Sequence, residues 1–112
     1  MWTDWEKKVD PNYTIPRHLL WDMNYERFDM KKGKRLVVER VIERGREKDY
    51  YAIFRMYGGP KGVRKIIKKD ITEFRWPWDL AWACAAFNLK EEETACYKHR
   101  LLRQKLINSW NG

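Results

Sequence analysis

The sequence predicts an all-α protein, a single domain spanning residues 1–112 with five helices, a buried fourth helix and an extended N-terminal arm. The first reason is a run of eight consecutive apolar residues, Leu80–Phe87, which would be apolar on every side of a helix and so needs neighbours around it. The second is the helical spacing of apolar residues in segment 47–57. The third is length, because 112 residues suffice for one core and leave no room for a second.

Residues 1–28 are predicted to form the arm. Pro11 and Pro16 interrupt this segment. Its larger apolar side chains recur without a helical period, at Ile15, Leu19, Leu20, Trp21, Tyr25 and Phe28. A segment this apolar is expected to lie on the body of the domain.

The first two helices are predicted from caps and spacing. The first follows Asp29, a good N-cap, and runs to about Arg44, where Gly45 ends it. Its expected buried face is Val37, Val38, Val41 and Ile42. The second spans 47–57 and ends at the turn residues 58–60; its apolar face has the spacing i, i+3, i+4 and i+7, at Tyr50, Ile53, Phe54 and Tyr57.

The remaining three helices complete the predicted domain. The third spans 61–69, and a connector at 70–76, with room for a short extended piece at 71–74, leads to the fourth at 77–87. Asn88 ends the fourth helix, and the fifth runs from about Lys90 to Ile107, with acidic residues in its first turn and basic residues later. Its expected inner face is Ala95, Leu101, Leu102 and Leu106.

The charge is strongly basic and unevenly distributed. The net charge is +8, yet residues 1–30 carry six acidic and four basic side chains. This excess favours an anionic partner, either nucleic acid or an acidic protein face. Residues 1–10 lack the apolar core of a signal peptide, and no apolar run approaches the ~20 residues that span a bilayer, so a cytoplasmic protein with no membrane contact is expected.

The best candidates for contact with nucleic acid or another anionic partner are basic residues on the third helix and at the start of the first. They are Lys61, Arg64, Lys65, Lys68, Lys69, Lys31, Lys32, Lys34 and Arg35. No set of Asn, Gln or Arg on the third helix is arranged for reading bases, so any binding would be directed mainly to the phosphate backbone. The alternative is a solvated lysine face with no partner.

Three groups of residues have types and spacings that could support chemistry, and a structural role is expected for each. Cys96 and His99, with Cys84 and His18, could supply four zinc ligands, but the two cysteines read as reduced packing residues. His18 and Asp22 could form a base and its orienting carboxylate, but His18 and Trp21 are expected to anchor the arm through packing and one hydrogen bond each, with Asp22 capping a turn.

Glu39 and Glu43 stand one helical turn apart, which could suggest paired carboxylates for acid–base work. These glutamates are instead expected to form a solvated face of ion pairs, because their neighbours are Arg35, Arg40 and Arg44. The sequence therefore predicts no catalytic residue, no metal and no cofactor.

Four motifs carry a family resemblance. They are IPRHLLWD at 15–22, VVERVIERG at 37–45, MYG at 56–58 and ACYK at 95–98. Together they resemble a family of small uncharacterised bacterial proteins with a domain of unknown function, over about residues 15–100. Members are often encoded beside an abortive-infection toxin of the nucleotidyltransferase type, so the resemblance implies a partner or antitoxin of such a toxin and names no catalytic residue.

The chain departs from the family pattern at two helix starts. Arg46 stands where the family tends to have Asp, and Trp76 where it tends to have Ser. Both are poor N-caps, so Arg46→Asp is expected to stabilise the fold by about 1 kcal/mol.

The expected function is that of a protein-binding regulator without enzymatic activity, which docks through aromatic residues and the basic face. The alternative is a nucleic-acid-binding module that uses the basic third helix. Retention on heparin and a steep loss of affinity with salt would distinguish the second from the first.

Overall fold

The computed structural model describes residues 2–111, and within them every regular element is helical. The α-helices are α1 (Trp5–Lys8), α2 (Lys34–Arg44), α3 (Glu47–Tyr57), α4 (Gly59–Lys69), α5 (Pro77–Phe87) and α6 (Ala95–Asn111). Short 3₁₀ turns are η1 (Arg17–Leu20), η2 (Tyr25–Arg27) and η3 (Glu91–Glu93). The all-α prediction is confirmed, and the count of five helices is wrong because α1 forms within the arm.

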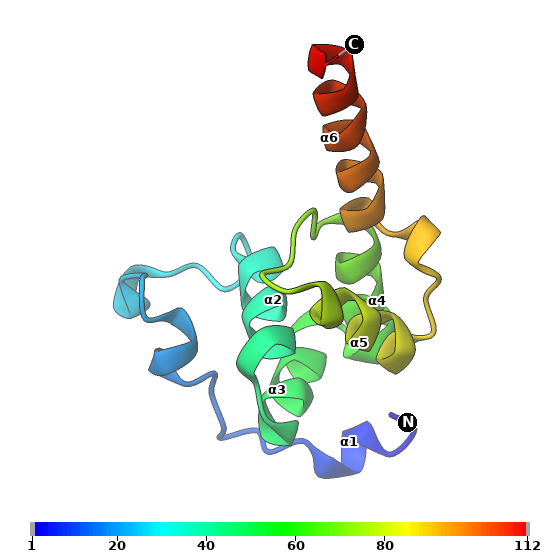
Figure 1. Ribbon diagram of the computed structural model, residues 1–112. Coiled ribbons are helices and arrows are strands. Elements are labelled where there is room, and N and C mark those ends of the chain that lie inside the picture. The colour runs from blue at the N-terminus through cyan, green and yellow to red at the C-terminus, as the bar shows by residue number, and fades with distance from the viewer. Residues whose placement is uncertain (1, 112) are drawn as a thin grey trace.

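Helices α2, α3 and α4 form the centre of the body, and α5 packs against α2 and α4 (Figure 1). The buried side chains of α2 and α4 lie at helical spacing, as the sequence predicts, whereas α3 is buried over the consecutive residues 49–54. The apolar side chains of the four helices that are fully shielded from solvent are Val37, Val38, Val41, Ile53, Phe54, Val63, Ile67, Leu80 and Ala83. Gly58 ends α3 in the left-handed conformation with φ 87°, which glycine adopts without strain.

The N-terminal segment follows the surface of the body and is only partly extended, because α1, η1 and η2 interrupt it. Ile15, Leu19 and Leu20 are each only 1% exposed. The Trp2 indole N–H donates a 2.8 Å hydrogen bond to the carbonyl of Ala86 in α5. The start of the N-terminal segment is thus held to α5, which lies far along the sequence.

Helix α5 is not the surrounded central helix that its composition predicts. It buries one face, which includes Leu80, Ala83 and Phe87, whereas Trp78 is 63% and Trp82 is 41% exposed. The exposed Ala81 and Ala85 add little apolar area to the outer face, so most of its apolar area comes from the indoles. The Trp82 indole N–H donates to the Tyr50 hydroxyl at 2.7 Å.

The C-terminal helix also departs from the prediction. Lys90 does not start it; Glu91–Glu93 form η3, and the Thr94 hydroxyl accepts the N–H of Tyr97 at 3.2 Å, so α6 begins at Ala95. From there α6 projects away from the body (Figure 1), and its expected inner residues Leu101, Leu102 and Leu106 are exposed. No described helix, within residues 2–111, combines the length and apolar character needed to cross a membrane.

Candidate functional site

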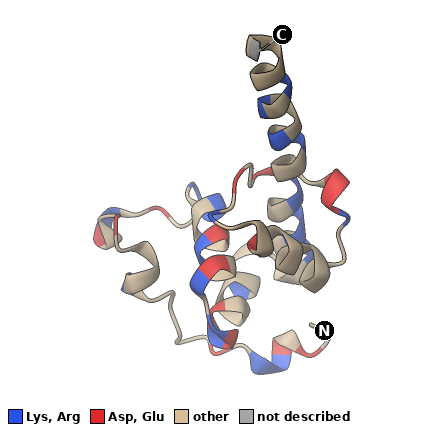
Figure 2. Ribbon diagram, viewed as in Figure 1, with Lys and Arg blue, Asp and Glu red and all other residues tan. Residues whose placement is uncertain are grey.

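The first candidate site is a basic hollow between α2 and α4. Lys34 from the start of α2 and Lys65 and Lys69 from α4 line a cavity of about 330 Å³. Tyr57, Gly62, Ile66 and Asp70 complete its wall. The 3.9 Å ion pair from Lys34 to Asp70 leaves Lys65 and Lys69 as exposed cations at its rim. Figure 2 shows the basic residues along these two helices.

Two predicted binding residues on α4 have contacts within the protein instead. Arg64 donates from Nε to the carbonyl of Phe87 at 3.0 Å and from a terminal nitrogen to that of Asn88 at 3.3 Å. It therefore satisfies carbonyls at the C-terminal end of α5. Lys68 lies 3.6 Å from the Glu93 carboxylate.

The other predicted basic residues lie apart from the hollow. Lys61 lines a separate apolar cavity beside Trp2 and Trp5. Lys31 and Lys32 lie in the turn before α2, where their backbone N–H groups donate to Asp29 at 2.9 and 3.1 Å. Arg35 is exposed on α2.

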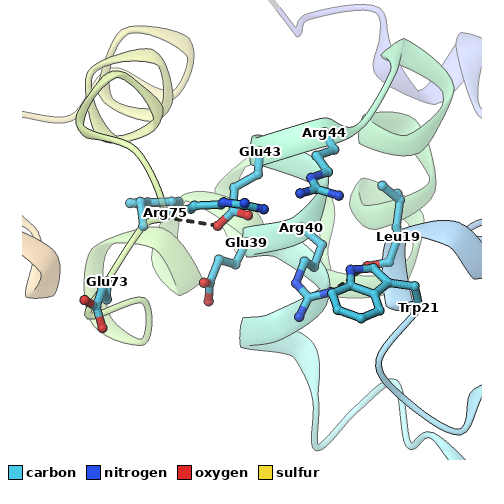
Figure 3. A pocket seen from close by; sticks show the side chains of 9 residues that line it. Leu19, Trp21, Glu39, Arg40, Glu43, Arg44, Glu73 and Arg75 are labelled. Atoms are coloured by element: carbon cyan, nitrogen blue, oxygen red, sulfur yellow. Dashed lines mark hydrogen bonds between the residues drawn. The ribbon is translucent and has the colours of Figure 1, made fainter.

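The second candidate site is a cleft of about 310 Å³ where the N-terminal segment, α2 and the 70–76 connector meet (Figure 3). Helix α2 supplies two glutamates and two arginines, the connector one of each with Phe74, and the N-terminal segment Leu19 and Trp21. The charged residues are Glu39, Arg40, Glu43, Arg44, Glu73 and Arg75. The cleft thus combines three acids, three bases and an apolar edge.

Glu39 is the most perturbed carboxyl in this cleft. Burial and the neighbouring Glu43 raise its pKa to about 7, against a weaker opposing effect of Arg35 and Arg40. The expected neutralisation by arginines is incomplete because Arg40 makes a bidentate pair with Asp22, at 3.0 and 2.8 Å, and also donates to the Leu19 carbonyl. Glu39 can therefore gain or lose a proton near neutral pH, a property that the sequence interpretation missed.

Asp22 accepts hydrogen bonds from Arg40 of α2 and does not orient His18. Its hydrogen bonds to Arg40 lower the pKa of its carboxyl and tie the N-terminal segment to the helix. Asp22, expected to cap a turn, thus ties the segment to α2, whereas Trp21, expected to anchor the segment by packing, is 69% exposed.

The cysteines are buried and free. Burial raises the pKa of the Cys84 thiol to about 11 and raises that of Cys96, the opposite of what activates a thiolate nucleophile. Within residues 2–111, no group of three or more His, Cys, Asp or Glu side chains is placed to hold a metal ion. The four zinc-ligand candidates are therefore not brought together.

An exposed aromatic surface lies on the outer side of α5. Trp76 and Trp78 stack with ring centroids 5.0 Å apart and an angle of 6° between the rings, and the Arg75 guanidinium lies 5.4 Å from the Trp76 ring. Because the sequence predicts that the helix at 77–87 is buried, it does not predict this surface. The stacked pair, together with Trp82, is called the tryptophan face below.

Comparison with known proteins gives one family match. A family of unknown function (DUF6922) matches residues 15–67, which run from the buried Ile15 through α2 and α3 into α4. No curated protein and no solved structure matches the chain. The match leaves out α5 and α6 and assigns no activity.

Proposed function

We propose that the protein is a non-enzymatic, protein-binding regulator that acts in the cytoplasm. The observation that carries this proposal is the tryptophan face, where Trp76, Trp78 and Trp82 are 44%, 63% and 41% exposed. Clustered exposed indoles are costly in water and are enriched among the residues that dominate protein interfaces. The raised pKa values of both thiols also favour packing over chemistry at the cysteines.

The proposed partner is a toxin of the nucleotidyltransferase type, for which this protein acts as an antitoxin-like binder. Support comes from the family resemblance of the motifs at 15–22 and 37–45. The net charge of +8 would add electrostatic attraction to an acidic partner.

Co-expression with the product of the adjacent gene tests this proposal. The two proteins should co-purify in a fixed ratio, and Trp76→Ala combined with Trp78→Ala should weaken binding by about 100-fold, as hot-spot truncations do. Met23→Ala is the control, because Met23 is also exposed, at 39%, but lies in the N-terminal segment. Elution as two separate species would refute the toxin partnership.

A second candidate function is nucleic-acid binding, favoured by the convergence of Lys34, Lys65 and Lys69 on one hollow. A phosphate group placed there would meet cations from two helices. The two functions differ in their salt dependence: duplex binding should fall steeply with salt, whereas a complex formed through the tryptophan face should persist.

A further inference from the structure

Helix α6 exposes a second apolar surface, distinct from the tryptophan face. Every residue from Leu101 to Trp110 is exposed, and Leu102, Leu106 and Trp110 are 60%, 62% and 88% exposed. Figure 1 shows this part of α6 extending beyond the body. A helical segment of about ten residues is marginal by itself in water, so it gains most from a partner that covers it.

The apolar residues follow a pattern suited to a groove. Leu102, Leu106 and Trp110 stand at i, i+4 and i+8, which places them in one stripe. Leu101 and Ile107 are also exposed, at 47% and 52%, and helical spacing places them on opposite flanks of that stripe. A flat surface could cover the stripe alone, whereas a groove would also cover both flanks.

The charges of α6 indicate the charge expected of that groove. Residues 95–111 contain four Lys or Arg residues and no Asp or Glu: Lys98, Arg100, Arg103 and Lys105. Arg103 reaches Glu73 at 3.2 Å near the start of the exposed segment. A second copy of the helix would bring like charges together, whereas an acidic surface would attract them.

We infer that α6 binds as an amphipathic helix in an acidic, apolar-floored groove of a protein partner. The inference rests on the proposed protein-binding function and names the element that enters the partner. Leu102, Leu106 and Trp110 fill the floor, and Lys98 and Lys105 meet carboxylates along one wall. An anionic membrane is the less suitable partner, because a helix lying on a bilayer buries one side and leaves Leu101 or Ile107 in water.

The test uses the full chain in its native cells with the photo-crosslinking residue p-benzoylphenylalanine in place of Leu106. The matched control carries it in place of Gln104, which is exposed on the opposite side of α6 and donates a hydrogen bond to Asn108. The expected result is one protein adduct from position 106, at least fivefold stronger than from position 104. The adduct should map to a peptide rich in Asp and Glu and weaken at least fivefold with Lys98→Glu and Lys105→Glu.

Four results would overturn the inference: an adduct with a second copy of the chain, an adduct with lipid, equal yields at both positions, or no protein adduct. A companion measurement separates this failure from that of the proposed function. Leu102→Gln with Leu106→Gln should lower affinity for the co-purified partner at least tenfold, and Gln104→Ala with Asn108→Ala should not. If the wild-type complex forms but the leucine variant binds equally well, the groove inference fails and the proposed function stands; if wild type forms no complex, both fail.

Discussion

The Tyr13 hydroxyl donates a 2.6 Å hydrogen bond to the carboxylate of Asp49, a residue of α3 that is 2% exposed. The same carboxylate accepts the backbone N–H of Arg46 at 2.8 Å. This pairing raises the pKa of Tyr13 to about 12, because the bonded carboxylate disfavours the phenolate. Arg55 reinforces the junction by donating to the Pro11 and Tyr13 carbonyls.

Tyr13→Phe should therefore destabilise the fold by about 2 kcal/mol, because a buried carboxylate loses one of its two donors. Denaturant unfolding followed by circular dichroism measures this change. Thr3→Ala, at an exposed position of the same segment, is the control and should change stability little. Equal stability of Tyr13→Phe and wild type would show that the hydrogen bond contributes nothing.

Glu39 should make stability depend on pH. Its pKa in the folded protein is about 7, above the usual 4.5, so the folded state holds the proton more tightly than the unfolded state. The free energy of unfolding should fall as pH rises from about 4.5 through about 7. Glu43 and Glu73 raise this pKa, and Arg35 and Arg40 lower it. Arg44 and Arg75 are the other charged residues that line the cleft.

Glu39→Gln should remove this decline and stabilise the protein at pH 8 by roughly 1 kcal/mol, a value reduced from the full pKa effect because the half-exposed carboxyl is screened by solvent. Thermal melts at pH 5 and pH 8 provide the comparison. The prediction fails if wild type and variant lose stability in parallel between these two pH values.

The sequence predicted the presence and the ends of α2, α3 and α4 because each has apolar residues at helical spacing and ends at glycine or a polar turn, but α2 begins at Lys34 and not after Asp29, and α4 begins at Gly59 and not at Lys61. The predicted burial was wrong for α5 and α6. An apolar composition shows that burial is favourable, but it does not show that other residues of this chain cover the helix. Leu106 and Trp78 are apolar and exposed for that reason.

The candidate sites show the same limit. Residue type identified the cations of α4, but only tertiary contacts separate Lys65, at the rim of a hollow, from Arg64, which binds carbonyls at the end of α5. Likewise, Arg40 is adjacent in sequence to Glu39, yet its bidentate hydrogen bonds go to Asp22 from the N-terminal segment. The spacing of residues along α2 does not show that Asp22 competes with Glu39 for Arg40.

Gly62 allows α3 and α4 to approach closely. A Cβ atom at this position would clash with the Tyr57 carbonyl oxygen, which is backbone and cannot rotate away. Gly62→Ala should therefore destabilise the fold by about 3 kcal/mol, although alanine favours helix elsewhere. Lys61→Ala is the neighbouring control, and a melting temperature of Gly62→Ala at or above that of the control would contradict the close approach.

The basic hollow should dominate binding to polyanions. Lys65→Gln with Lys69→Gln removes two charges from one hollow, whereas Lys7→Gln with Lys90→Gln removes two exposed charges elsewhere. Both variants have the same net charge. A difference in the salt concentration that elutes them from heparin would therefore show that the position of the removed charges matters. The hollow variant should elute earlier, and its dependence of log affinity on log salt should be less steep by about 2 for duplex DNA; identical elution would show that only net charge matters.

Arg46 occupies the N-cap position of α3 with an extended backbone, φ −102° and ψ 175°, and its side chain makes no capping hydrogen bond. Arg46→Asp would supply an acceptor but would place a second carboxylate beside Asp49, which already accepts the Arg46 N–H. Arg46→Ser supplies the acceptor without that repulsion and completes a reciprocal capping box with Asp49. Serine should therefore stabilise by about 1 kcal/mol and aspartate by less. Melting temperatures of both variants at pH 8 distinguish these outcomes, and a larger gain for aspartate would show that the charge of Asp49 has no effect on the cap.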